Sequence, residues 1–287
     1  MDGERLFCDT ALAARIDRAE ARLTAESSDA ARVRRGDDVG FARPLAGGVA
    51  SFAEADSPFN KVIGLGFDGV PPEAELAEVE AAFAELGAPV QVELSPLADP
   101  AVGALLTRRG YHLESFESVL GRRLGDAGEP AGVRLIREDE LERWLAVVAD
   151  ASAVADTEGL PSHEDFPRET LIRALRDMSG VRRYVAERDG EFAGGASFRV
   201  TDGIAQFTGA ATVPRFRRRG VQTALLRARL AAAAEAGCDI AVVTTQPGSK
   251  SQQNVQRQGF DLLYARAILV KGTSATSSSG ADSRQAS

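Results

Sequence analysis

The spacing of apolar residues is most regular in the second half of the chain. After a short apolar run at 133–136, residues 138–154 and 166–178 repeat apolar side chains with the period of a helix. Between 181 and 213 the period falls to two, and Asp189-Gly190 and Asp202-Gly203 are strong hairpin signals. The pattern predicts a strand, two helices and then an antiparallel meander of three strands.

Beyond residue 220 the period changes again. A stripe of small and aliphatic residues from Val221 to Ala232 predicts a helix that ends at Gly237. The apolar run 239–245 predicts a buried strand, 249–259 a short polar helix and 260–271 a final strand. The predicted order therefore continues with helix, strand, helix and strand.

The first half of the chain contains a similar ending. When Gly110 is aligned with Gly259, 149 residues later and without gaps, a strand, a short polar helix and a final strand coincide. An internal duplication would explain the match, and so would two unrelated units of helix, glycine and strand. If the duplication is real, the helix predicted at 71–87 corresponds to the one that begins near Val221.

Two segments of low apolar content divide the chain. Residues 121–132 are rich in Gly and Pro and are typical of a linker, so we place a boundary at Gly128. The predicted domains are 1–128 and 129–271. Residues 272–287 are mostly Ser, Gly and Ala with little to bury, and they are predicted to be a disordered tail.

Composition narrows the class of protein. The chain has 287 residues, enough for two domains, and 44% of them are hydrophobic. No apolar run approaches the roughly 18 residues of a membrane span, and the charged N-terminus lacks the apolar core of a secretory signal. We therefore expect a soluble cytoplasmic protein with no membrane partner. The net charge of -8 argues against nucleic acid as a partner, because neutralising phosphates needs a basic surface.

Few residues are available for metal or disulfide chemistry. Cys8 and Cys238 lie far apart in the sequence, and only His112 and His163 could join them. This pattern contains no metal-ligand spacing, so we expect no metal cofactor.

A cluster of arginines precedes the helix at Val221. The segment "PRFRRRGVQTALL" carries Arg215 and Arg217 to Arg219, then Gly220. A helix N-terminus exposes unpaired N–H groups and favours anions, and the glycine permits close approach, so the segment suits a phosphate. It matches neither a P-loop nor a dinucleotide-binding fingerprint. A solvated face or a set of ion pairs is the competing interpretation.

The context of these arginines resembles the GNAT superfamily of N-acyltransferases. A meander strand leads into Arg217-x-x-Gly220-x-Gln222, which is similar to the family signature Q/R-x-x-G-x-G/A and departs from it at Gln222. The resemblance covers the second half in element order as well as in motif. It implies an α/β (α+β) fold with a mixed, mostly antiparallel sheet flanked by helices, here as two copies in tandem of which the first is degenerate. It also implies acetyl-CoA as cosubstrate, with a cofactor site formed by Ala211, Thr212, Val213, Arg217, Arg218, Arg219, Gly220, Gln222, Thr223 and Asn254.

The resemblance also implies direct attack of an amine on the thioester. Such a reaction needs an oxyanion donor, for which the backbone N–H of Val213 or its neighbour is the candidate. The tyrosine that many members use as general acid is replaced by Val255, and Tyr264 is the nearest substitute, although a buried structural tyrosine fits the same position. The strand before the arginines offers no carboxylate as base.

Acceptor binding is predicted at two places. The polar segment after the first helix of the second half supplies Glu158, His163 and Asp165, and Asn60 of the first half is a further candidate. An acidic protein carries such loop residues without any role in binding as well.

Two hypotheses of function follow. The first is an N-acetyltransferase for a primary amine of a small molecule, active as a monomer or homodimer. The second is a catalytically silent acyl-CoA-binding or regulatory module, which the missing acid and base would favour. The first half carries acids and no arginine at the start of its helix 71–87, so we expect that it does not bind acyl-CoA.

Overall fold

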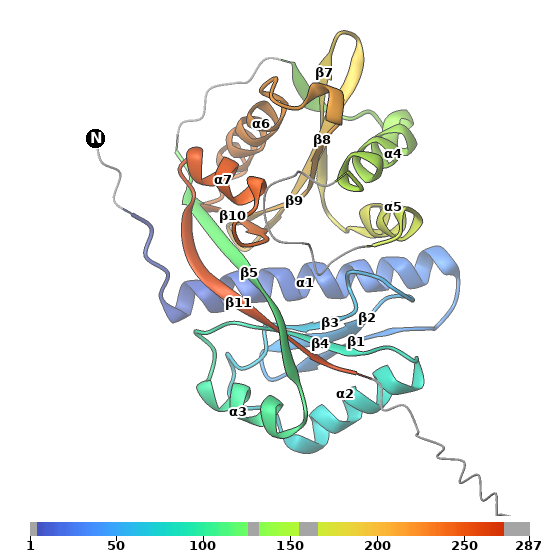
Figure 1. Cartoon of the computed structure of the whole chain (residues 1–287), viewed down its shortest axis with the longest axis vertical. Helices are drawn as coiled ribbons and strands as arrows, with labels where there is room; N and C mark the ends of the chain where they lie inside the picture. Colours follow the sequence, from blue (N-terminus) through green and yellow to red (C-terminus); the bar gives the residue numbers. More distant parts are fainter. Residues whose placement is uncertain (1–4, 126–131, 155–165, 273–287) are drawn as a thin grey trace, which may run out of the picture.

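The fold is built on one mixed sheet that runs through both halves of the chain. The computed structural model describes residues 5–125, 132–154 and 166–272. Within them, eleven strands form a sheet in the order β1-β2-β3-β4-β11-β5-β10-β9-β8-β7-β6 (Figure 1). Only the pairs β3 with β4 and β9 with β10 are parallel, so the predicted fold class, a mostly antiparallel sheet flanked by helices, is confirmed.

The first half begins with a long helix and continues through five strands and two helices. Asp9 caps the first helix by accepting from the N–H of Leu12, and Gly36 ends it in the left-handed conformation. The elements are α1 (Thr10–Arg35), β1 (Phe41–Leu45), β2 (Gly48–Phe52), β3 (Lys61–Ile63), α2 (Glu73–Glu85), β4 (Val90–Leu94), α3 (Pro100–Arg108) and β5 (His112–Arg123).

The second half has the order that the sequence predicts. Asp189 and Asp202 adopt positive φ before Gly190 and Gly203, which is the backbone conformation that the two tight hairpins require. The elements are β6 (Val133–Leu135), η1 (Glu138–Glu140), α4 (Leu141–Ser152), α5 (Arg168–Asp177), β7 (Arg182–Arg188), β8 (Glu191–Thr201), β9 (Ile204–Thr212), η2 (Pro214–Phe216), α6 (Val221–Glu235), β10 (Ile240–Thr245), α7 (Lys250–Arg257) and β11 (Asp261–Lys271).

The two halves end in the same run of elements. The series α2, β4, α3 and β5 recurs as α6, β10, α7 and β11, and each series follows a strand that pairs in parallel with its second member. The bounds of each pair of elements agree with the 149-residue alignment to within about two residues at most ends. The predicted boundary near Gly128 and the predicted tail 272–287, apart from Gly272, lie outside the described residues.

The last strands of the two halves are exchanged within the sheet. β5 pairs with β10 of the second half, whereas β11 pairs with β4 of the first half, and β5 and β11 pair with each other at the centre. Each half therefore completes the sheet of the other.

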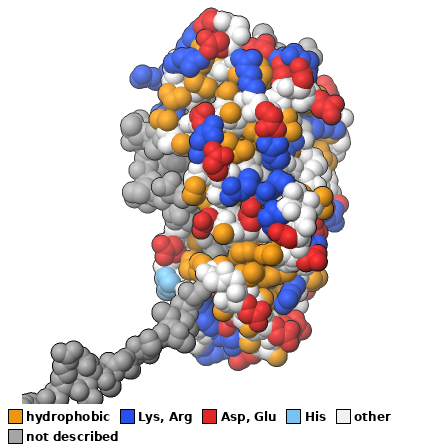
Figure 2. Space-filling view, turned by 90° about the vertical axis from the view of Figure 1, so that its right-hand side faces the viewer, with side chains coloured by type: hydrophobic (Ala, Val, Ile, Leu, Met, Phe, Trp, Pro, Cys, Tyr) orange, Lys and Arg blue, Asp and Glu red, His pale blue; other side chains and the backbone are white. Residues whose placement is uncertain are grey.

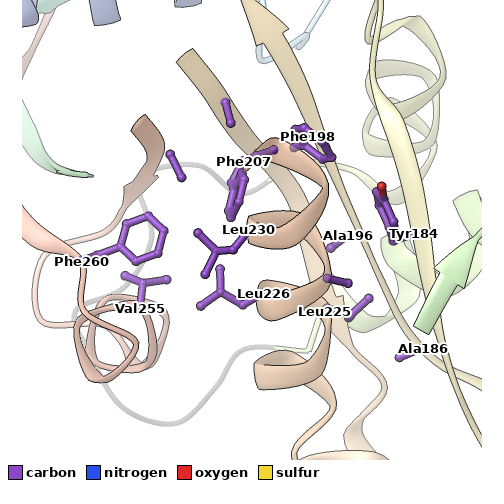
Figure 3. Packing of buried hydrophobic residues seen from close by; sticks show 14 of the residues in the cluster. Tyr184, Ala186, Ala196, Phe198, Phe207, Leu225, Leu226, Leu230, Val255 and Phe260 are labelled. Atoms are coloured by element: carbon purple, nitrogen blue, oxygen red, sulfur yellow. The ribbon is translucent and has the colours of Figure 1, made fainter. Parts of the chain in front are cut away.

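Helices cover both faces of the sheet. In the second half α4 and α5 lie on one face and α6 and α7 on the other, and α1 crosses the molecule between the halves (Figure 1). A core of Phe207, Leu226, Leu230, Val255 and Phe260 packs α6 and α7 onto β9 (Figure 3).

A buried ion cluster joins the halves on the α1 face. Arg266 of β11 is fully buried and contacts Asp17 and Glu20 of α1 at 3.0 Å and Glu93 of β4 at 2.8 Å. Burial alone would lower the pKa of Arg266, but the carboxylates around it hold that pKa well above its ordinary value. The cluster therefore fixes α1 against the exchanged strand.

The surface beside α4, α5 and the end of α1 carries charges of both signs close together (Figure 2). Arg34 of α1 there contacts Glu54 at 2.6 Å and Asp177 of α5 at 2.9 Å. No helix of the described residues is long and apolar enough to cross a membrane.

Candidate functional site: an opening between two parallel strands

The sheet opens between β9 and β10. The two strands pair from Ile204 with Ile240 as far as Phe207 with Val243, and beyond that point β9 pairs only with β8. The register of β9 against β8 also shifts at Gly209 and Ala210, which oppose the single residue Ala196 in a β-bulge. Gly209 adopts φ +53, a conformation that few other residues accept. Because of the bulge and the lost pairing, the C-terminal part of β9, from Thr208 to Thr212, has no partner strand on the side that faces β10.

A pocket of about 170 Å³ lies on the α6 and α7 side of this opening. Its walls come from four elements, the two strands that part and the two helices that cover them. The lining residues are Phe207, Thr208, Gly209, Ala210, Gln222, Leu226, Arg229, Val243, Thr244, Ser251 and Val255.

The N-terminus of α6 lies at the end of the same strand. Gly220 is its N-cap with φ 76, no side chain caps the helix, and the first turn holds no acidic residue. Arg218 also adopts positive φ, at 61°, so two left-handed residues turn the chain just before the helix. Because the N–H groups of a first helical turn have no partner within the helix, this end can receive an anion.

The arginines before α6 divide into different roles. Arg217 turns inward and donates to the carbonyl oxygens of Val154 at 2.5 Å and Ala151 at 3.3 Å, which anchors the loop to the end of α4. Arg219 pairs with Asp189 at 3.0 Å, and Arg215 forms an ion pair with Glu191. Arg218 is exposed and has no hydrogen-bond or ionic partner in the described part of the chain. Of the three predicted phosphate contacts, Arg218 is the one whose guanidinium is unengaged.

Two predicted cofactor residues on different helices contact each other. The side-chain amide of Asn254 on α7 donates to Gln222 Oε1 on α6. Gln222 also lines the pocket, and Thr223 follows it, half-buried, in the first turn of α6. The glutamine that departs from the family signature is therefore held by a partner from the neighbouring helix.

The predicted backbone donor is Val213 or its neighbour, and the structure disfavours Val213. Its N–H donates to the carbonyl of Ala193 on β8 at 3.0 Å and is already used in the sheet. Backbone groups alternate between the two sides of a strand, so the N–H of the adjacent Thr212 points away from β8. Consistent with this orientation, the carbonyl of Thr212 accepts from Arg217 Nε at 3.3 Å.

Tyr264, the predicted general acid, is not brought to the pocket. It is buried on the α1 side of the sheet, where its hydroxyl donates to Asp17 Oδ1 at 2.7 Å. Burial and the nearby Asp17 carboxylate raise its pKa well above the ordinary value. This placement favours the structural interpretation of Tyr264.

The predicted acceptor residues are not assembled by the described structure. Glu158, His163 and Asp165 lie outside the described residues. The amide of Asn60 is used locally, since it accepts from the N–H of Ala53 at 2.8 Å and donates to the carbonyl of Glu54 at 2.7 Å. Asn60 therefore closes the turn between β2 and β3.

Arg229 is a pocket residue that is absent from the residues predicted from the sequence. This residue of α6 is 3% exposed and lines the pocket, with its guanidinium carbon 4.5 Å from the centre of the Phe207 ring. A signal was present, because Arg229 falls on the same helical stripe as the buried residues Val221, Leu225 and Ala233.

The corresponding helix of the first half has a different N-terminus. α2 begins after Pro72 with Glu73 and Glu75 in its first turn. Carboxylates there stabilise the helix and repel phosphate. Among the described residues, no group of three or more His, Cys, Asp or Glu side chains is arranged to hold a metal ion.

Comparisons with known proteins bear on the family and the fold. Residues 135–260 match the model of the acetyltransferase (GNAT) family. A GCN5-related N-acetyltransferase from Kribbella flavida is similar in structure, with a TM-score of 0.60, 20% identity, and coverage of 88% of this chain and 95% of that one. A second, from Sphaerobacter thermophilus, has a TM-score of 0.52 and 15% identity over 90% of this chain and 93% of that one.

A tandem GNAT protein from the clavulanic acid biosynthesis pathway is also similar, with a TM-score of 0.54, 14% identity, and coverage of 95% of this chain and 99% of that one. The comparison with curated proteins gave no match. At these identities the solved structures establish the fold. The second half of the chain is a domain of the GNAT acetyltransferase family, and the whole chain shares its fold with members of that family.

Proposed function

We propose that this protein is an acyltransferase that moves an acyl group, acetyl in the simplest case, from an acyl-CoA to a primary amine of a small molecule. One observation carries the proposal. The pocket adjoins the unpaired end of β9 through Gly209 and Ala210, and the first turn of the uncapped helix α6 through Gln222. A phosphate at the start of α6 and a thioester beside β9 would fit this arrangement.

The pyrophosphate would bind at the start of α6. The unpaired N–H groups of the first turn would donate to it, and Arg218 would add a full positive charge. Arg217 would act indirectly, because it ties the loop to the end of α4. The first half would not bind a second acyl-CoA, since Glu73 and Glu75 stand at the corresponding helix start.

The pantetheine arm would follow β9 into the opening. Its amides and the thioester carbonyl would accept hydrogen bonds from backbone N–H groups of β9, Thr212 among them. The neutral amine nitrogen would attack the carbonyl carbon, the carbon–sulfur bond would break, and the thiolate would leave with the proton that the amine loses. Proximity and a fixed oxyanion donor supply much of the rate in such a reaction.

The acceptor would reach the thioester from the α4 side. Residue 155 follows directly on Val154, whose carbonyl is held by Arg217 of the signature loop. Glu158, His163 and Asp165 follow Val154 in the sequence, and we keep them as the proposed contacts to the acceptor. Asn60 is a weaker candidate because both ends of its amide are engaged.

A catalytically silent acyl-CoA-binding module remains the second candidate. The observation in its favour is chemical: the described residues that line the pocket include no carboxylate, histidine, tyrosine or cysteine that could act as general acid or base. Release of CoA thiol from acetyl-CoA in the presence of a panel of primary amines separates the two candidates, because a silent module binds acetyl-CoA without turnover.

The acyl-CoA site itself is tested by calorimetric titration with acetyl-CoA. Thr223→Glu places a carboxylate in the first turn of α6, where it stabilises the helix but repels pyrophosphate, so we expect affinity to fall about tenfold or more without loss of thermal stability. Thr223→Gln is the matched neutral control and should bind within about threefold of the wild type. If the folded wild type binds neither acetyl-CoA nor any other acyl-CoA nor CoA itself, the proposed function is overturned.

A further inference from the structure

Arg229 is a buried cation without an anion. It is 3% exposed, and its side chain donates to two carbonyl oxygens, that of Ser197 at 3.0 Å and that of Leu225 at 3.3 Å. No carboxylate lies within ion-pair distance of it among the described residues. Burial lowers the pKa of Arg229 to about 9, which reflects the same lack of a counter-ion.

Other buried arginines of the chain are compensated. Arg266 is surrounded by carboxylates from three elements, including Asp17 and Glu93. Arg199 of β8, which is also buried, pairs with Glu26 of α1 at 2.9 Å. Arg229 has no such partner among the described residues, where its contacts are the two carbonyl oxygens and the ring of Phe207. A buried charge is costly unless it is paired, so an anion supplied from outside the chain is the expected partner.

The position of Arg229 indicates which part of an acyl-CoA could supply that anion. Arg229 lies eight residues beyond Val221 on α6, which is about 12 Å along the helix axis and too far to share a phosphate held at the N-terminus. Its guanidinium packs on Phe207, the last residue of β9 that still pairs with β10. Arg229 therefore lies at the inner end of the opening, where β9 and β10 begin to pair. The proposed phosphate site at the start of α6 lies at the other end.

We propose that Arg229 recognises a carboxylate at the far end of the acyl group, so that the preferred donor is the CoA thioester of a short dicarboxylic acid. The inference rests on the proposed function and specifies its substrate class. The guanidinium would keep its two carbonyl contacts and use its remaining N–H groups for the carboxylate, an interaction that suits the planar fork of arginine.

The transferred bond is the same as for an acetyl group. The amine nitrogen forms a bond to the thioester carbonyl carbon, the carbon–sulfur bond breaks, and the thiolate takes up the proton released from the amine. The distal carboxylate remains unchanged and ends on the product. Arg229 acts on specificity, because it contacts a part of the donor that does not react.

The first test compares length-matched donors on the wild-type protein. Binding of malonyl-CoA is measured against propionyl-CoA, and that of succinyl-CoA against butyryl-CoA, by calorimetric titration. We expect at least one carboxylated donor to bind about tenfold or more tightly than its neutral match, as a desolvated arginine–carboxylate pair provides. Equal or weaker binding of both carboxylated donors would overturn the inference, and this result needs no variant to fold.

The second test removes the charge. Arg229→Met keeps the unbranched apolar stem of the side chain but removes the guanidinium, so it should abolish the preference while leaving affinity for the neutral donor within about threefold. Arg227→Met, at an exposed position of the same helix, is the control and should keep the preference. An equal loss for both donors in Arg229→Met would assign Arg229 a structural role or a role toward the thiolate, and would overturn the inference.

The two proposals fail separately. Binding of CoA and acetyl-CoA with no preference for carboxylated donors rejects only the role of Arg229. Absence of binding by every thioester and by CoA itself rejects the proposed function.

Discussion

Tyr264 and Arg266 occupy successive inward positions of β11 and share one partner. The hydroxyl of Tyr264 donates to Asp17 at 2.7 Å, and Arg266 contacts the same carboxylate at 3.0 Å. Asp17 is fully buried, so each contact compensates the desolvation of a charge. A residue in this position acts on the stability of the fold, whereas a general acid must lie within hydrogen-bond reach of the leaving sulfur.

The substitution Tyr264→Phe distinguishes these roles. We expect the free energy of unfolding in urea to fall by about 1–3 kcal/mol, because a hydrogen bond to a buried carboxylate is lost. The rate of thiol release at saturating substrate should change by less than about threefold, since loss of general acid catalysis would cost about 100-fold or more. Tyr184→Phe is the control, because the hydroxyl of Tyr184 has no hydrogen-bond partner in the described ranges. A large loss of rate with unchanged stability in Tyr264→Phe would restore the catalytic assignment.

The sequence predicts the arginine loop better than it predicts the residues around the reacting atoms. The arginines, Gly220 and the start of α6 are neighbours in the sequence. The position of Gly220 and the absence of a capping side chain could therefore be inferred from the residues alone. Tyr264 is predicted as general acid because it is the nearest tyrosine to Val255 in the sequence, but β11 has an irregularity between Leu262 and Tyr264. A bulge of this kind changes the face to which later residues point, and spacing alone does not reveal it.

At the scale of elements, the helices of the second half are positioned by close contact with glycines. The single tryptophan of the chain, Trp144 on α4, is 1% exposed and donates to the carbonyl of Tyr184 at 2.8 Å. A Cβ atom at Gly195 of β8 would lie 2.5 Å from Trp144 Nε1. α4 therefore packs directly on β8. Near the C-terminal end of α4, the carbonyl of Ala151 accepts a hydrogen bond from Arg217 of the loop before α6.

Gly195→Ala should move α4 away from the sheet. We expect destabilisation by about 1–3 kcal/mol from overpacking, a red shift of Trp144 fluorescence, and weaker binding of acetyl-CoA because the anchor of Arg217 shifts. Gly103→Ala is the control, for which we expect the opposite effect on stability. A Cβ atom at Gly103 would lie no nearer than 3.8 Å to another side chain. In helix α3 that change should stabilise by about 0.5–1 kcal/mol. Unchanged fluorescence and affinity in Gly195→Ala would contradict the packing described here.

The elements of the second half follow from periodicity, whereas α1 is harder to infer. Its buried face includes Thr24, Ser27 and Ser28 beside alanines, so small polar residues lie where a pattern of burial expects aliphatic ones. Ser28 makes a hydroxyl contact with Ser51 of β2 at 2.6 Å, which satisfies the buried group. Such a helix is recognised from its packing partner and not from its own sequence.

At the scale of the whole molecule, the exchange of final strands was beyond the reach of the sequence. β5 and β11 occupy equivalent positions in the 149-residue alignment and have similar apolar patterns. Judged by its apolar pattern alone, each of these two strands could complete the sheet of either half. The choice depends on long-range contacts such as that of Arg266 on β11 with Glu93 on β4, which local periodicity does not encode.

The exchange predicts that the second half does not fold alone. A fragment of residues 129–271 keeps β10 and β11 but lacks β4 and β5, so β10 loses one neighbour in the sheet and β11 loses both of its neighbours. We expect this fragment to be insoluble or to unfold without a cooperative transition, and to bind no acetyl-CoA. Co-expression with residues 1–128 should restore a soluble complex that binds acetyl-CoA.

A shorter fragment of the first half tests whether β5 is the part that restores the second half. Residues 1–110 end before His112, the first residue of β5, and should not rescue the second half. Size-exclusion chromatography, thermal unfolding and acetyl-CoA titration of the fragments provide the measurements. If 129–271 alone is a monomer that unfolds cooperatively and binds acetyl-CoA with the affinity of the whole chain, β11 must be able to pair with β10 directly, and the exchanged strand is not required for the site.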